Sequence, residues 1–72
     1  MATYVFLGTA LSHTLDDGTY IGERIGLKDT IGDAETNPRT IYGLIDGGSS
    51  IVMDQNYQAL EFVWNGQTWS VF

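Results

Sequence analysis

Apolar residues recur at every second position in short runs along this chain, and turn-forming residues separate the runs. A period of two places alternate side chains on opposite faces of a strand, whereas no segment keeps the period of a helix. The connections are rich in Gly, Asp and Asn, which tolerate positive φ or bond their own backbone. The pattern predicts an all-β domain, a small antiparallel β-sandwich or barrel-like fold of six to seven short strands with a C-terminal hairpin. The runs lie at residues 3–7, 11–15, 24–28, 39–44, 50–54, 58–64 and 68–72.

The last 13 residues, LEFVWNGQTWSVF, have the pattern of a β-hairpin. Asn65-Gly66 is typical of a type I′ turn, in which both central residues have positive φ. Such a turn would pair Trp64 with Gln67, Phe62 with Trp69 and Leu60 with Val71. One face then carries core residues, namely Leu60, Phe62, Trp64, Trp69 and Val71. Packing in this core is favoured over a ligand-stacking role for the two tryptophans.

The opposite face of this hairpin is mixed rather than fully polar, because it includes Val63 and Phe72. A mixed second face is expected where a sheet meets a partner. The 72-residue chain buries little core of its own and has no cysteine, so a metal or neighbouring subunits are the remaining routes to added stability.

Three cations face nine carboxylates, which gives a formal charge of -6. Nucleic acid and anionic membrane surfaces are therefore disfavoured as partners, because both demand positive charge. No run of about 20 apolar residues is present, and the apolar N-terminal stretch lacks the charged start of a signal peptide.

All three cations lie within residues 22–43, where two of them share one face of a predicted strand and the third begins the next strand. The connection between these strands carries three carboxylates, so a chain that folds back here holds both signs close together. We predict an ion-pair corner whose exposed pairs contribute only about 0 to 1 kcal/mol each and mainly fix the path of the loop. Its members are Arg24, Lys28, Asp29, Asp33, Glu35 and Arg39.

A catalytic site is not indicated. His13, the one histidine, would need a serine such as Ser12, Ser49 or Ser50 beside it, and no serine has a nucleophile-elbow sequence. A structural or surface histidine is the favoured interpretation. No dinucleotide or phosphate-loop motif is present, and we predict a protein that is not an enzyme and needs no cofactor.

Calcium is the alternative role for the acidic loops. Asp29, Asp33 and Glu35 alternate through one loop, and Asp16-Asp17 or Asp46 could converge on them. The spacing of an EF-hand is absent, so a role as turn formers and ion-pair partners is favoured.

The order of several short motifs resembles a small β-module of tailed-bacteriophage virion proteins, found in capsid-decoration, head-fibre and tail-fibre appendages. The resemblance covers about residues 11–72, from TLDDGTYIGERIGLKD through GDAETNPRTIYG to the final hairpin. The matching positions are Gly22, Arg24, Lys28, Asp29, Gly32, Ala34, Thr36, Asn37, residues 45–47, Tyr57, Leu60, Trp64, Gly66, Trp69 and Val71.

The resemblance implies a virion structural protein, commonly trimeric and without an enzymatic site. Such modules often end long fibre proteins, whereas here only residues 1–10 precede residues 11–72, which we expect to be a single all-β module. That arrangement favours a capsid decoration, or cement, protein that forms a homotrimer on the outer capsid surface and bridges major capsid subunits. Residues 1–10 would be a docking segment or strand, with Tyr4 and Phe6 toward the shell and Val63 and Phe72 between protomers.

Two competing functions stay open. A tail-fibre or appendage module for adsorption would use the same fold, with exposed aromatics such as Tyr20, Tyr42 or Tyr57 contacting glycans. A glycan hydrolase is the more distant alternative, because no carboxylate pair has a fixed separation and a chain of this length leaves little room for a cleft.

Overall fold

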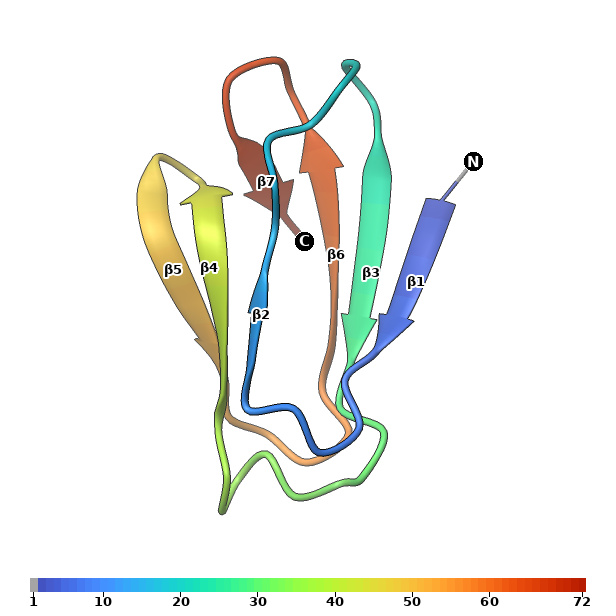
Figure 1. The fold of residues 1–72 in the computed structure, drawn as a ribbon, viewed down its shortest axis with the longest axis vertical. Coiled ribbons are helices and arrows are strands. Elements are labelled where there is room, and N and C mark those ends of the chain that lie inside the picture. Colours follow the sequence, from blue (N-terminus) through green and yellow to red (C-terminus); the bar gives the residue numbers. More distant parts are fainter. Residues whose placement is uncertain (1) are drawn as a thin grey trace.

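The computed structural model describes residues 2–72 as seven strands without a helix, which confirms the predicted all-β fold (Figure 1). Within these residues no helix is long and apolar enough to cross a membrane. The strands are β1 (Ala2–Phe6), β2 (Ser12–Thr14), β3 (Arg24–Lys28), β4 (Arg39–Ile45), β5 (Gly48–Met53), β6 (Ala59–Trp64) and β7 (Trp69–Val71).

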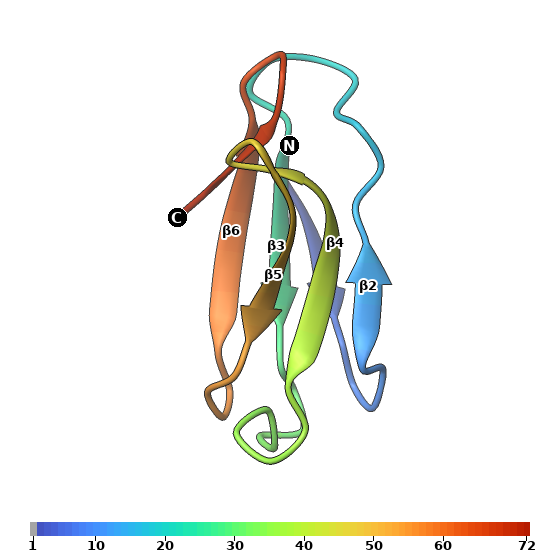
Figure 2. The same cartoon turned by 90° about the vertical axis from the view of Figure 1, so that its left-hand side faces the viewer.

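The strands form one curled sheet in the order β1-β3-β6-β7-β4-β2, with β5 added against β4 (Figures 1 and 2). The sheet is mixed rather than purely antiparallel, because β1 pairs with β3, β2 with β4 and β4 with β7 in parallel. Parallel neighbours need a long crossover connection. The chain provides it by leaving β1 at one end of the sheet, forming β2 at the other end and then returning to β3.

Residues 2–6 of the predicted N-terminal docking segment therefore form an ordinary strand of the chain's own sheet, and Met1 lies outside the described residues. Parallel pairing sets Tyr4 beside Gly26 and Phe6 beside Lys28. Val5 faces inward and packs against the core, while Tyr4 and Phe6 face outward.

The concave side of the curled sheet holds the core. Phe62, Trp64 and Trp69 come from the C-terminal hairpin, and Leu60 and Val71 pack against them while partly buried. Leu7 comes from the first crossover (residues 7–11, between β1 and β2) and Leu15 from the second crossover (residues 15–23, between β2 and β3), and both belong to the core. The buried members of the core are Leu7, Leu15, Leu27, Ile41, Ile45, Met53, Phe62, Trp64 and Trp69.

The second crossover packs directly on the two tryptophans, whose rings meet edge to face with centroids 5.3 Å apart. A side chain at Gly18 would place its Cβ 2.1 Å from the Trp64 ring, so only glycine lets the backbone approach this closely. The Trp69 Nε1–H donates to the Asp16 carbonyl at 3.0 Å, which satisfies the buried indole. The two tryptophans thus serve as packing residues.

The predicted register of the C-terminal hairpin is wrong by two residues. Trp64 pairs with Trp69 and Phe62 with Val71, across a four-residue loop rather than a two-residue turn. Asn65 lacks the positive φ that a type I′ turn needs, and its Oδ1 accepts bonds from the Gln67 and Thr68 amides. An Asx-type loop therefore replaced the expected turn. A shift of two preserves which residues face the core.

The type I′ geometry appears instead between β4 and β5. Asp46 and Gly47 both have positive φ, at 48° and 79°, and the flanking Ile45 and Gly48 are paired. This two-residue turn has the Asp-Gly sequence that such hairpins favour.

The hairpin loop gives a first prediction. Asn65→Ala removes the acceptor of two amide bonds and should lower the free energy of unfolding by about 1 to 2 kcal/mol, whereas Asn65→Asp keeps the acceptor and should cost less. Urea unfolding followed by tryptophan fluorescence measures both. Gln67→Ala, in the same exposed loop, is the control and should be neutral. Equal losses for the Ala and Asp variants would contradict the role given to Oδ1.

Candidate functional site

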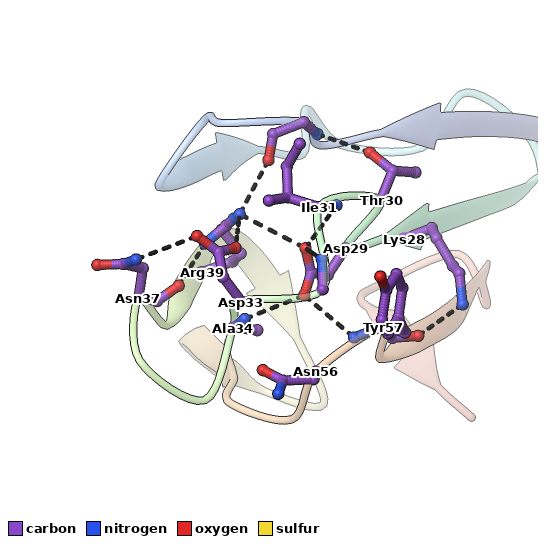
Figure 3. A network of polar contacts seen from close by, with 12 residues as sticks. Lys28, Asp29, Thr30, Ile31, Asp33, Ala34, Asn37, Arg39, Asn56 and Tyr57 are labelled. Carbon is purple, nitrogen blue, oxygen red and sulfur yellow. Dashed lines mark hydrogen bonds and ion pairs between the residues drawn. The ribbon is translucent and has the colours of Figure 1, made fainter.

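Asp29 is a charged residue with no exposed surface, placed directly after β3. Its Oδ1 accepts hydrogen bonds from the Ile31 and Gly32 amides, and its Oδ2 from the Ala34 and Tyr57 amides, at 3.0 to 3.1 Å (Figure 3). Three of these amides belong to the loop after β3 and the fourth to the loop between β5 and β6. The carboxylate thus joins two loops that are distant in sequence.

Arg39, the first residue of β4, extends into the same site with its side chain 1% exposed. Its guanidinium lies 3.5 Å from Asp29 Oδ1 and 2.6 Å from Asp33 Oδ1. It also donates to the Gly8 carbonyl at 2.9 Å and to the Asn37 carbonyl (Figure 3). The first crossover is thereby tied to the loop between β3 and β4. Charge-assisted bonds of this kind are stronger than neutral ones.

The environment of the two carboxyls favours their charged forms. Burial by itself would raise the pKa of Asp29, but the amides of Gly32, Tyr57, Ala34 and Ile31 outweigh it and lower the pKa from 3.8 to about 2. The bond from Arg39, and next the bond from Asn37, lower the pKa of Asp33. Both residues are ionised at neutral pH and supply the negative charge that pairs with the Arg39 guanidinium, whose two terminal nitrogens are bonded while its Nε is buried without a partner in residues 2–72.

The ion-pair corner differs in two ways from the one expected from sequence. It is buried at Asp29 and Arg39 rather than exposed, so it contributes to the interior of the fold and not only to the loop path. It also has fewer members. Arg24 lies at the opposite end of β3 and pairs with Glu61 at 3.2 Å, and Glu35 is exposed.

Lys28 lies next to the corner but pairs with no carboxylate. Its Nζ donates to the Tyr57 carbonyl at 2.6 Å and lies 5.8 Å from the centre of the Tyr57 ring. It therefore fixes the loop between β5 and β6 through a neutral acceptor and a cation–π contact.

The acidic loops do not converge on a common point. Within residues 2–72 no group of three or more histidine and carboxylate side chains could hold a metal ion. The Asp29 carboxylate, which is the centre of the calcium hypothesis, is already occupied by four amides. His13 is half buried in β2 beside Ile41, with Ser12 exposed next to it.

A second feature lies on the convex side of β1, β3 and β6, which we call face A. One cross-strand row runs Tyr4, Gly26, Glu61 and Phe72, and neighbouring rows add Phe6 and Val63. Tyr4, Phe6 and Phe72 are 66 to 75% exposed. These aromatics surround a groove of about 420 Å³, whose floor includes Gly26 and Ala59. Apolar side chains this exposed around one groove make face A a candidate contact surface.

Gly26 explains both the groove and the position of Tyr4. A Cβ at this residue would lie 2.6 Å from the Tyr4 ring, so the ring lies over the glycine. Tyr4 and Phe6, predicted to contact the shell, and Val63 and Phe72, predicted to contact a protomer, consequently share one face. The sequence pattern had placed Ala59 and Glu61 on the same mixed face of the hairpin as Val63 and Phe72, but it missed Gly26 as part of this surface, although a glycine in a strand signals close approach.

Some of the residues that carry the sequence resemblance lie in or beside the buried corner. Asp29, its amide donors at Gly32, Ala34 and Tyr57, and the neighbouring Lys28 are all motif positions. These positions help to hold the loops around Asp29. No family model and no curated protein matches this chain.

The lowered pKa values give a second prediction. Because the folded carboxyls hold protons more weakly than unfolded ones, both stabilise the fold at neutral pH and lose this contribution in acid; for Asp29 the contribution is present well above pH 3.8 and is lost as pH falls through 3.8 toward 2. Urea unfolding from pH 7 to pH 2 should show this loss. Asp29→Asn places an amide against four backbone donors, so it should be less stable at pH 7 and show a shallower decline below pH 4.

Glu35→Gln is the matched control, since it removes an exposed carboxylate from the same loop. It should retain the wild-type decline. A variant Asp29→Asn with an unchanged profile would show that the corner does not cause the acid sensitivity.

Proposed function

We propose that this chain is a structural protein of a tailed-phage virion, a capsid decoration protein that forms a homotrimer on the outer capsid surface and bridges major capsid subunits. The observation that supports the proposal best is face A, where three aromatic side chains are more than half exposed around an apolar groove. A small domain with such a surface gains stability by covering it. The order of the motifs supplies the virion context.

The corner supports a structural role in a second way. Its ionised groups are directed at backbone amides and at one another rather than at a cleft. A perturbed carboxyl in a cleft would suggest catalysis, but the Asp29 oxygens have no free side toward solvent. The charged residues of the corner thus hold loops, and the exposed apolar residues of face A are available for assembly.

The alternative, an adsorption module that binds glycans, would use an aromatic platform. Tyr20, Tyr42 and Tyr57 are about half exposed or more, but they belong to three separate elements: the second crossover, β4 and the loop between β5 and β6. The aromatics that share one groove are those of face A, and this favours assembly over glycan binding.

A third prediction tests the proposal directly. In purified virions that encode this chain, quantitative mass spectrometry should find a copy number close to that of the major capsid protein. Because decoration proteins follow the capsid lattice, particles carrying Phe6→Ser should have lower occupancy, while Gln67→Ala particles should match wild type. A copy number of a few per cent or less would assign the chain to a tail or fibre and support the adsorption module instead.

A further inference from the structure

The exposed charges of this protein are divided unequally between its surfaces. Face A holds Arg24, Lys28 and Glu61, which is two cations and one carboxylate. Arg39 is buried and pairs with the buried Asp29 and the partly exposed Asp33. Three of the nine carboxylates, Glu61, Asp29 and Asp33, pair with a cation. The other six pair with no cation within residues 2–72. They are Asp16, Asp17, Glu23, Glu35, Asp46 and Asp54.

A second apolar surface lies on the convex side of β4 and β5, which we call face B. Its apolar members are Tyr42, Leu44 and Val52, each 45 to 51% exposed. Asp16 and Asp17 lie beside Leu44 around one shallow hollow. Face B therefore combines apolar side chains with negative charge and contains no cation. Its strands lie on the other side of the molecule from β1 and β3 (Figure 1).

We propose that copies of this chain bind head to tail, with face A of one copy covering face B of the next. The groove of face A is apolar and has cations at its edge, while face B presents exposed apolar side chains beside carboxylates. Leu44 or Tyr42 can fill the groove between Tyr4, Phe6 and Phe72 as the buried anchor of the contact. Opposite charges at the edges then fix the orientation.

Pairing of like faces is less favourable on the same grounds. Two copies of face A would bring their cations and their two hollows together, and two copies of face B would oppose Asp16 and Asp17 with the same residues. Like charges across an interface are destabilising. A second copy that presents its unlike face supplies the opposite charge.

A contact between unlike faces is heterologous, so it closes into a ring or continues as an open chain. The inference rests on the proposed function, whose trimer is the closed form of this contact. It also changes the predicted contact of Tyr4 and Phe6, because these side chains would contact the neighbouring protomer rather than the capsid shell. A standard interface covers roughly 800 Å² of each partner, so both faces together use somewhat more than a third of the 4335 Å² surface.

The test uses two variants that each block one face. Phe6→Glu places a carboxylate in face A, and Leu44→Asp places one in face B; both residues are exposed, so folding should be retained and circular dichroism verifies it. In sedimentation velocity over a concentration series, the wild-type protein should be a trimer and each variant a 7.9 kDa monomer. Gln67→Glu adds the same charge to a loop outside both faces and should stay trimeric.

An equimolar mixture of the two variants gives the decisive result. The Phe6→Glu chain keeps an intact face B and the Leu44→Asp chain an intact face A, so the mixture should form a 1:1 heterodimer that cannot grow. Native mass spectrometry identifies its composition.

Three results would overturn the inference: a monomeric wild-type protein, a Leu44→Asp variant that still self-associates, or a mixture that stays monomeric. The copy number in virions is measured independently. A shell-like copy number with a monomeric protein in solution would leave the decoration function standing and reject the head-to-tail contact.

Discussion

The carboxylate of Asp29 connects more of this fold than any other side chain group described above. It follows β3 directly, it receives amides from the loop before β4 and the loop before β6, and it lies against the guanidinium that begins β4. Arg39 extends the connection to Gly8 in the first crossover. A buried charge is costly unless it is paired and fully bonded, and this one is both. The cost of leaving it unpaired constrains the path of every segment that reaches it.

This constraint fits the size of the chain. The chain has no cysteine, and its core consists largely of residues from one curled sheet and two crossovers. The polar corner holds the first crossover and the loops before β4 and β6 in place. The second crossover, which carries Gly18, covers Trp64 and Trp69 at the other end of the core. Between these two ends, the convex side of the sheet exposes apolar side chains on face A and on face B. A domain that leaves apolar area uncovered after folding is suited to assembly, because association completes the burial.

Strand β3 contributes to both the core and face A. Its inward residues Ile25 and Leu27 pack on the core, while its outward residues Arg24, Gly26 and Lys28 belong to face A. The absence of a side chain at Gly26 makes the groove and seats the Tyr4 ring. Lys28 contacts the loop that also donates to Asp29. Face A is thus attached through β3 to the polar corner.

The sequence by itself determined the strands, because the period of two and the Gly, Asp and Asn clusters are local signals. It also identified the inward face of the last hairpin, which a register shift of two leaves unchanged. The hairpin register was decided by the side chain of Asn65, which bonds two amides of a four-residue loop in place of the tighter turn. The parallel pairings of β1 with β3 and of β2 with β4 depend on where the two crossovers place these strands, which no local sequence pattern indicates.

The candidate site shows the same division. Clustering of cations and carboxylates within residues 22–43 indicated an ion-pair corner, but only the tertiary structure decided that Asp29 and Arg39 are buried while Arg24 reaches Glu61. Burial depends on which distant loops cover a residue, and the Tyr57 amide and Gly8 carbonyl come from far along the chain. Face A likewise needed the pairing of β1 with β3 to place Tyr4 over Gly26. The alternation of inward and outward side chains along one strand can be predicted from neighbouring residues. A surface shared by several strands can be identified only when the register between those strands is known.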